Sequence, residues 1–407
     1  MEPTDNVYKM ARYAYTNVPV YMRIAENMGI EVHKLNDREL WDAIPCIEKS
    51  MLVNEESDCI SVKFINKLYQ DKLIHVCTSG STGMYMNIYW DESDYMRSLT
   101  SLWLYRRKFY SINPDDKLVY FYTLRSAQGA ELEYEYGKYS MGISKLLVTM
   151  DRIQEVYMEI HKYSPKWMML QPSVALMLCQ VKKKYKLPDI KSIAYIEMTG
   201  EFLSKEVRNT VKETFKCNIA NQYGCNEVNS IAYECPNGNM HCMADNVYTS
   251  ITDNDIYITT LRNFAMPLVK YGLGDNVVWD NSLVKCPCGC DSPVLIVNNG
   301  RQFDYIRLPD GGKTSSSCIH RLFDIVNMQM DGAIKQYNVL QEEYDLFTAV
   351  IVVDEDMYIT EMIKHMLTEM LSDCLGYYVN VNIREMDMII PNQKTGKLKS
   401  FECLVDN

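Results

Sequence analysis

The stretch from residue 192 to residue 224 constrains the fold of this chain more than any other. The apolar run SIAYIEM (192–198) predicts a buried strand, and a short Thr-Gly-Glu turn follows it. A helix is predicted next, because Ser204 is a suitable N-cap and apolar residues recur at helical spacing from 203 to 215. NIANQYG (218–224) predicts the next strand. This order is typical of α/β folds, which bind ligands in the loops at the carboxyl ends of their strands.

The C-terminal part of the chain predicts a smaller α+β unit. Strands are predicted at 333–340 and 347–354, and an alternating pattern predicts another at 377–383. A helix between them would bury one apolar face. The residues of that face are Ile359, Met362, Ile363, Met366 and Met370.

The length of the chain predicts more than one domain. A chain of 407 residues is too long for a single compact core. We expect a large N-terminal domain with several subdomains (1–302) and a small C-terminal domain (303–407). The glycine-rich, charged stretch 298–313 contains the predicted hinge.

Charge and composition exclude several classes of partner. The formal net charge is −11 and no basic run stands out, so neither nucleic acid nor an anionic membrane surface is an expected partner. The N-terminus lacks the apolar run of a signal peptide, and no stretch reaches the roughly 20 apolar residues that cross a bilayer. With no export signal, the 14 cysteines are expected to be cytosolic thiols, some of them on a metal, which predicts a cytoplasmic protein.

A run of small polar residues follows the apolar stretch LIHV (73–76). Its successive N–H and O–H groups can surround a polyphosphate. It is not a Walker A loop, because no Gly-Lys-Ser/Thr follows it, and taken alone it also fits an ordinary exposed turn. The residues of this run are Thr78, Ser79, Gly80, Ser81, Thr82 and Gly83.

Several residues that suit a nucleotide lie at the ends of predicted strands or beside the hinge. In QYGCNE (222–227), Tyr223 can stack on a base, and Glu227 can hold Mg²⁺ beside phosphates. Asp275 follows two glycines in VKYGLGD and suits a ribose diol. Taken alone, each also fits a surface turn or a solvated charge.

Two cations complete this set. Arg301 lies beside the predicted hinge, and Lys397 follows a glycine near the C-terminus. A mobile lysine of this kind can neutralise charge that develops at a phosphoryl centre. Charged residues near chain ends are more commonly solvated tails, and that alternative stays open.

In their order along the chain, these motifs resemble those of the adenylate-forming superfamily, which contains acyl-CoA synthetases, adenylation domains and luciferases. The motifs are T-S-G-S-T-G, T-G-E, Y-G-C-N-E, Y-G-L-G-D, G-R-Q-F-D and T-G-K. The closest resemblance is to the phenylacetate–CoA ligase-like branch, and it covers nearly the whole chain. YTNVPVYMRIAENMGI and DAIPCIEKSML also resemble the N-terminal segment of that branch.

The resemblance implies a nucleotide site at these motifs. The loop 78–83 would cradle the β- and γ-phosphates of ATP, and Glu227 would bind Mg²⁺. Gly200 and Glu201 would lie along the adenine, and Tyr223 would stack on it.

The resemblance also implies roles for the remaining motif residues. Asn226, which follows Gly224 in the same motif, stands where the family usually has Thr near the α-phosphate. Asp275 would hold the ribose hydroxyls, with Arg301 nearby. Lys397 would bridge the carboxylate and the α-phosphate during adenylation.

The chain departs from the family pattern at two places. Tyr85 and Met86 stand where the family usually has Pro and often Lys after the phosphate loop. At the hinge, Phe303 stands where an acidic residue is usual, and Asp304 follows it. The hinge residue is therefore left open between these two.

Two Cys/His clusters predict a structural zinc site independently of ATP. CPNGNMHC (235–242) and KCPCGC (285–290) offer paired clusters of soft ligands, which indicate a closed Zn²⁺ site in a reduced compartment. The C-x-C spacing in the second cluster is shorter than the usual C-x₂₋₄-C. Unliganded thiols in two loops are the alternative. The predicted ligands are Cys235, His241, Cys286 and Cys288.

The expected activity is a two-step ligase reaction. A carboxylic acid would attack the α-phosphate of ATP to give acyl-adenylate and pyrophosphate, and the small domain would then move to admit a thiol. The thiol is expected to be coenzyme A, with carrier-protein phosphopantetheine as the alternative. The stretches 118–139 and 168–178 favour an aryl or arylalkyl acid. Whether the chain forms a homodimer is left open. The departures from the family pattern also leave open a non-catalytic function, as a zinc-stabilised nucleotide-binding protein.

Overall fold

The computed structural model describes residues 2–53, 56–78, 85–122, 133–149, 151–201, 203, 205–282, 285–297, 305–330, 333–353, 360–386, 389 and 400–405. The chain forms two compact units, and the α/β fold class is confirmed. The first unit comprises Met1–Thr78, Met86–Asn113 and Ala220–Arg301. The second comprises Ser79–Tyr85, Pro114–Ile219 and Gln302–Asn407. Because the second unit takes residues from both sides of position 302, the predicted division into 1–302 and 303–407 stays a prediction.

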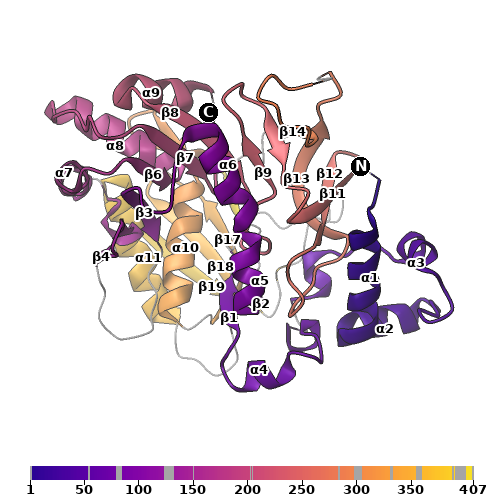
Figure 1. Cartoon of the computed structure of the whole chain (residues 1–407). Helices are drawn as coiled ribbons and strands as arrows, with labels where there is room; N and C mark the ends of the chain where they lie inside the picture. Colours follow the sequence, from indigo (N-terminus) through magenta and orange to yellow (C-terminus); the bar gives the residue numbers. More distant parts are fainter. Residues whose placement is uncertain are drawn as a thin grey trace. The chain divides into compact units, whose positions relative to one another are not determined.

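The first unit combines N-terminal helices with a largely antiparallel sheet (Figure 1). Its helical elements are α1 (Asp5–Asn17), α2 (Pro19–Asn27), α3 (Asp37–Ala43), η1 (Lys49–Met51), η2 (Glu56–Cys59), α4 (Ile65–Tyr69), α5 (Glu92–Ser98) and α6 (Thr100–Tyr110). Its strands are β1 (Ile74–Cys77), β2 (Asn87–Trp90), β8 (Asn218–Tyr223, from Ala220 on), β9 (Ala232–Glu234), β10 (Met240–Cys242), β11 (Val247–Thr252), β12 (Asp255–Thr260), β13 (Tyr271–Trp279) and β14 (Val294–Val297). The sheet order is β11-β12-β13-β14-β10-β9-β8, and β1 and β2 form a separate antiparallel pair.

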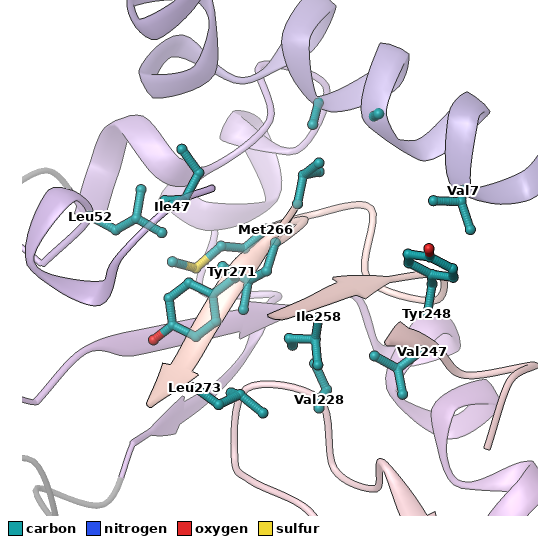
Figure 2. Close-up of a cluster of buried hydrophobic side chains, with 14 of the residues drawn as sticks. Val7, Ile47, Leu52, Val228, Val247, Tyr248, Ile258, Met266, Tyr271 and Leu273 are labelled. Carbon is teal, nitrogen blue, oxygen red and sulfur yellow. The ribbon is translucent and has the colours of Figure 1, made fainter. Parts of the chain in front are cut away.

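The apolar core of the first unit lies between its helices and the strands β11 to β13. Figure 2 shows Val7 on α1 and Ile47 and Leu52 beside η1, with Tyr248 and Tyr271 on the strands. Burial of a side chain of this size contributes about 1.5–3 kcal/mol. This packing holds η1, and with it Lys49, close to β13.

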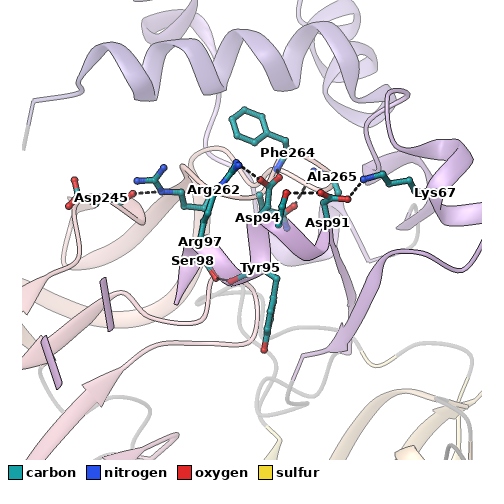
Figure 3. A network of polar contacts seen from close by, with 12 residues as sticks. Lys67, Asp91, Asp94, Tyr95, Arg97, Ser98, Asp245, Arg262, Phe264 and Ala265 are labelled. Carbon is teal, nitrogen blue, oxygen red and sulfur yellow. Dashed lines mark hydrogen bonds and ion pairs between the residues drawn. The ribbon is translucent and has the colours of Figure 1, made fainter. Parts of the chain in front are cut away.

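A polar network ties α5 to the loop before β13 (Figure 3). Lys67 forms an ion pair with Asp91, which precedes α5. One turn later, Oδ2 of Asp94 accepts a hydrogen bond from the backbone N–H of Phe264 at 3.3 Å. Burial raises the pKa of Asp94. Oδ1 of Asn263 accepts hydrogen bonds from the backbone amides of Ala265 and Met266, so three successive amides of this loop have partners before β13.

The second unit contains a mainly parallel sheet and a smaller mixed sheet. The parallel part has the order β7-β6-β3-β5-β4, with β4 antiparallel at its edge. Its elements are β3 (Leu118–Tyr122), β4 (Tyr134–Tyr136), β5 (Ser140–Ser144), η4 (Lys145–Leu147), α7 (Ile153–Tyr163), β6 (Trp167–Leu170), α8 (Pro172–Tyr185), β7 (Tyr195–Thr199) and α9 (Lys205–Phe215). The remaining elements are β15 (Tyr305–Arg307), β16 (Lys313–Ser315), α10 (Ser317–Gln329), β17 (Ile334–Gln341), β18 (Leu346–Val353), α11 (Thr360–Leu375), β19 (Asn380–Glu385) and β20 (Phe401–Cys403).

The elements predicted at the sequence level are present, with small shifts at their ends. The strand predicted at 192–198 is β7, and the helix after it is α9, which buries Val211. The C-terminal pattern of strand, strand, helix and strand is β17, β18, α11 and β19. Among the described residues, no helix is long and apolar enough to span a membrane.

The predicted apolar face of α11 is only partly correct, because Ile363 is buried but the row of methionines is not. Met362 is 53% exposed, and the buried residues are Ile363, Leu367 and Leu371. These three recur at the four-residue spacing of one helical face, next to the row of methionines. The prediction included Ile363 but missed Leu367 and Leu371, because Met and Leu are both apolar and the pattern covered more of the helix than its core-facing side. Ile359 lies outside the described residues.

Candidate functional site

A tight turn after β8 positions the first group of predicted site residues. Gly224 is required at its start, because a Cβ there would lie 2.1 Å from the carbonyl oxygen of Asn229. Gln222 closes the turn, since its Nε2 donates hydrogen bonds to the Asn229 carbonyl (3.1 Å) and to Oγ of Ser230 (2.9 Å). The turn therefore presents residues 225–227 from a rigid support.

Tyr223 and Asp275 contact each other in the structure, although they come from different predicted motifs. The Tyr223 hydroxyl donates to Oδ2 of Asp275 at 2.8 Å. Asp275 follows Gly274 on β13, and Gly274 has φ of +74°, which glycine adopts readily. An aromatic ring beside a carboxylate can stack on a base and bind the hydroxyls of a sugar.

Asn226 ties the turn to the strand that precedes the polar loop. Its Nδ2 donates to the carbonyl oxygen of Cys77 at 2.7 Å. Cys77 ends β1, and Thr78 begins the loop 78–83. Asn226 therefore holds the β8 turn against the base of that loop.

Glu227 is buried and faces a cation that the sequence analysis missed. Its side chain is 9% exposed, and Nζ of Lys49 lies 3.7 Å from its Oε1. The hydroxyl of Tyr271 on β13 donates to the same oxygen at 3.4 Å. Nζ of Lys49 also donates to Oγ1 of Thr78 at 2.9 Å. One ammonium group therefore connects the predicted Mg²⁺ ligand with the predicted phosphate loop.

Thr78 closes the base of the loop. Its backbone N–H donates to the carbonyl oxygen of Met86, and its Oγ1 accepts from the Met86 N–H, each at 2.9 Å. Met86 is fully buried, so the residue that departs from the family pattern here is part of the core. Thr78 and Met86 are thus joined by two hydrogen bonds.

A sequence signal for Lys49 exists in retrospect. Lys49 lies between Ile47 and Leu52, which are both fully buried in the core. A lysine inside a segment that supplies core residues on both sides can reach an internal carboxylate. The partner could not be identified from the sequence, because local patterns do not report contacts with Thr78 and Glu227 far along the chain.

We expect a Lys49→Met variant to lower the free energy of unfolding by about 2–4 kcal/mol, because it leaves the buried Glu227 without its cation. A Glu227→Gln change in the same variant is expected to recover part of this loss. Urea unfolding of the two single variants and the double variant measures the coupling.

Lys67→Met is the matched control for Lys49→Met. Lys67 is 47% exposed in its pair with Asp91, so its loss is expected to change stability by less than about 1 kcal/mol. Strictly additive effects of Lys49→Met and Glu227→Gln would contradict the pairing.

Cys225 lies in this site as an uncharged thiol and is not expected to react. Burial and the neighbouring Glu227 carboxylate raise the pKa of Cys225 well above its ordinary value. The group is therefore a protonated thiol at neutral pH and a poor nucleophile.

Gly200 and Glu201 lie in the second unit, directly after β7. Gly200 has φ of +80°, and it turns the chain out of the strand. The Glu201 carboxylate accepts hydrogen bonds from the backbone N–H (2.9 Å) and Oγ (2.8 Å) of Ser173, in the first turn of α8. Glu201 therefore stabilises the N-terminus of α8. The predicted adenine contact stays a prediction.

The four predicted zinc ligands lie together in the first unit. Their ligand atoms all fall within 4.8 Å of one another, for Cys235, His241, Cys286 and Cys288. Sγ of Cys235 and Sγ of Cys286 are 3.7 Å apart. Two thiolates on one tetrahedral zinc would be separated by about 3.8 Å, given Zn–S bonds of about 2.3 Å. The donor set and its spacing therefore fit a four-coordinate zinc ion.

Hydrogen bonds prepare two of these groups as ligands. Nδ1 of His241 donates to the carbonyl oxygen of Ser292 at 2.9 Å, which leaves the Nε2 lone pair facing Sγ of Cys288 at 3.2 Å. Burial opposes ionisation of Cys286, but hydrogen bonds from the Cys288 amide and from Asn239 prevail and lower the pKa of Cys286 to about 6. A thiolate is the form that binds metal.

Several predicted site residues lie outside the residues that the structure describes. These are Ser79, Gly80, Ser81, Thr82 and Gly83 of the loop, Arg301, Lys397, and the two hinge candidates Phe303 and Asp304. Their predicted roles stay predictions.

Comparison with protein families gives one match. The model of the family described as AMP-binding enzyme matches residues 46–260, which is more than half of the chain. The matched range includes Lys49, the polar loop and the turn that carries Glu227. No curated protein matches the chain.

Solved structures with this fold include several forms of 2-hydroxyisobutyryl-CoA ligase. A complex with 2-HIB-AMP and CoA in the thioesterification state has a TM-score of 0.61 at 17% identity, covering 98% of this chain and 88% of that chain. A postadenylation complex with R3-HIB-AMP has a TM-score of 0.59 at 16% identity, with the same coverage. At these identities the likeness shows the fold, a large N-terminal and a smaller C-terminal domain.

Proposed function

Because the chain belongs to the family of AMP-binding enzymes, we propose that it activates a carboxylic acid with ATP and transfers the acyl group to a thiol. The acid would attack the α-phosphate, forming acyl-adenylate and releasing pyrophosphate. The thiol would then displace AMP and form a thioester. Coenzyme A is the proposed acceptor, and the phenylacetate–CoA ligase-like branch is the proposed position within the family.

The contacts around Lys49 support this proposal most directly. One ammonium group contacts Thr78 at the base of the polar loop and lies 3.7 Å from the Glu227 carboxylate. When bound, Mg²⁺ would neutralise phosphate charge beside Glu227. Lys49 would add a fixed positive charge on the same side. The Thr78 hydroxyl, which accepts a hydrogen bond from the Met86 N–H, would keep the residue before the polar loop in place.

Tyr223 and Asp275 would hold the nucleoside. Their hydrogen bond holds the tyrosine hydroxyl in place, and the ring would offer a stacking surface for adenine. The second carboxylate oxygen of Asp275 would accept a hydrogen bond from a ribose hydroxyl. Lys397 would stabilise charge at the α-phosphate in the first step, and Arg301 would lie near the ribose.

An acid panel in an ATP–pyrophosphate exchange assay tests the proposed activity. We expect exchange that depends on the acid, with aryl or arylalkyl acids as the predicted class. Adding coenzyme A or a phosphopantetheine-bearing carrier protein then identifies the acceptor by the thioester formed. If the protein binds ATP but shows no exchange with any acid, the proposed enzymatic activity is wrong and a non-catalytic nucleotide-binding protein is favoured.

A structural zinc ion is the second part of the proposal. Cys235, His241, Cys286 and Cys288 would hold it in the first unit, where it would join the β9–β10 hairpin to the loop before β14. The zinc would stabilise the fold and would take no part in the reaction, because four protein ligands leave no open coordination position.

Purified protein is expected to contain about one zinc ion per chain. Chelation is expected to lower the melting temperature, because binding energy of a structural ion contributes to folding. Elemental analysis and thermal unfolding check both statements.

Cys286→Ser should lose the metal, and Cys290→Ser is the matched control, since Cys290 lies nearby but outside the cluster. Equal metal content in the two variants would contradict the assignment.

A further inference from the structure

Two cysteines outside the nucleotide site meet between helices α10 and α11 of the second unit. Cys318 lies in the first turn of α10 and Cys374 in the last turn of α11. The two helices pack against each other, and the two thiols are close enough to shift each other's pKa. Cys318 is 8% exposed, Cys374 is partly exposed, and both are free thiols.

Arg321 is the third member of this cluster. It follows Cys318 by three residues on α10, so both side chains lie on the same face of the helix. Nη2 of Arg321 donates to Sγ of Cys374 at 3.4 Å. Cys374 therefore accepts a hydrogen bond from a permanent positive charge and lies beside the Cys318 thiol.

This arrangement separates the roles of the two thiols. The neighbouring Cys318 thiol and the Arg321 guanidinium lower the pKa of Cys374 to about 6, although burial alone would raise it. The neighbouring Cys374 and burial raise the pKa of Cys318 well above its ordinary value. A thiolate next to a protonated thiol and an arginine is typical of redox-active cysteine pairs.

We propose that Cys318 and Cys374 form a reversible redox site that reacts with small disulfides such as glutathione disulfide and links α10 to α11. The Cys374 thiolate attacks one sulfur of the small disulfide, forms a mixed disulfide and releases one thiolate. Cys318 then transfers its proton to the released thiolate and attacks Sγ of Cys374. The mixed disulfide breaks, the Cys318–Cys374 bond forms, and the second thiolate leaves and takes a proton from water. The two cysteines lose two electrons, and the small disulfide is reduced to two thiols.

The link would constrain the small mixed sheet. The segment between the two cysteines includes β17 and β18, so the disulfide would close a long loop around half of that sheet. Closure of such a loop reduces the freedom of the unfolded chain. The oxidised protein is therefore expected to melt at a temperature about 5 °C higher than the reduced protein.

Peptide mapping of the full chain tests the site. Protein equilibrated with glutathione disulfide and digested without reductant is expected to yield a peptide pair joined through Cys318 and Cys374. Cys318→Ser should accumulate the mixed disulfide at Cys374, because the resolving thiol is gone. Cys374→Ser should form neither product. Cys403→Ser is the matched control and should react as the parent does, since Cys403 bonds to Gln341 and lies outside the cluster.

The role of Arg321 is tested by the pH profile of alkylation. Iodoacetamide should modify Cys374 with a midpoint near pH 6, and Arg321→Gln should move that midpoint upward by about one pH unit or more. Arg321→Lys should recover part of the shift. The proposal is overturned if folded parent protein gives only mixed disulfides, or if Arg321→Gln leaves the profile unchanged.

Discussion

An Asp275→Ala variant is expected to bind ATP about 10- to 100-fold more weakly than the parent protein while keeping its fold. Hydrogen bonds to a charged group contribute roughly 1.5–3 kcal/mol, and each 1.4 kcal/mol is about tenfold in affinity. Asp275 is half-buried on β13 and is not part of the apolar core, so truncation of its side chain is expected to leave the strand intact. Calorimetric titration with ATP measures the effect.

Tyr223→Phe is the matched control for Asp275→Ala. It removes the hydroxyl that donates to Asp275 at 2.8 Å but keeps the aromatic ring. Its loss of affinity should be smaller, because the carboxylate remains available to the ribose. If Asp275→Ala binds ATP as the parent does, or if Tyr223→Phe has the larger effect, the proposed ribose contact is wrong.

A Lys397→Ala variant is expected to slow adenylate formation by about 10²-fold or more. Its ammonium is proposed to stabilise charge that develops between the attacking carboxylate and the α-phosphate, and loss of one such group elsewhere costs 10²–10³ in rate. Thioester formation from synthetic acyl-adenylate should stay near the parent rate. Two single-turnover assays on the same variant separate the steps.

Lys394→Ala and Lys399→Ala are matched controls for Lys397→Ala, since they remove the same charge from the same segment. Both should form adenylate at close to the parent rate. Equal slowing of the two steps in Lys397→Ala would mean that the lysine is structural, or that one domain arrangement serves both steps.

Local features of the fold and site could be predicted from the sequence. The strand β7, the helix α9 and the strand β8 follow from apolar periodicity and a suitable helix start. The Cys/His clusters identified four side chains that the structure brings within 4.8 Å. These features depend on residue type and short spacing, which a single chain displays directly.

Contacts between distant segments were decided only by the tertiary structure. Tyr223 and Asp275 were predicted separately for one nucleotide, and their hydrogen bond appears only once β8 and β13 are placed in the same unit. The buried face of α11 was misjudged because the helix carries more apolar residues than its core contact needs. Which of two apolar rows faces inward depends on the sheet beneath it.

Lys49 shows this difference most clearly. Its sequence neighbours predict a core segment around a lysine, but they do not identify Thr78 or Glu227 as its partners. The core of the first unit holds η1 near β13, and this packing brings the ammonium to Thr78 and Glu227. The sequence by itself determined which motifs are present, because their chemistry is local. Only the tertiary structure decided which charges meet, because burial of distant apolar segments sets the distances between them.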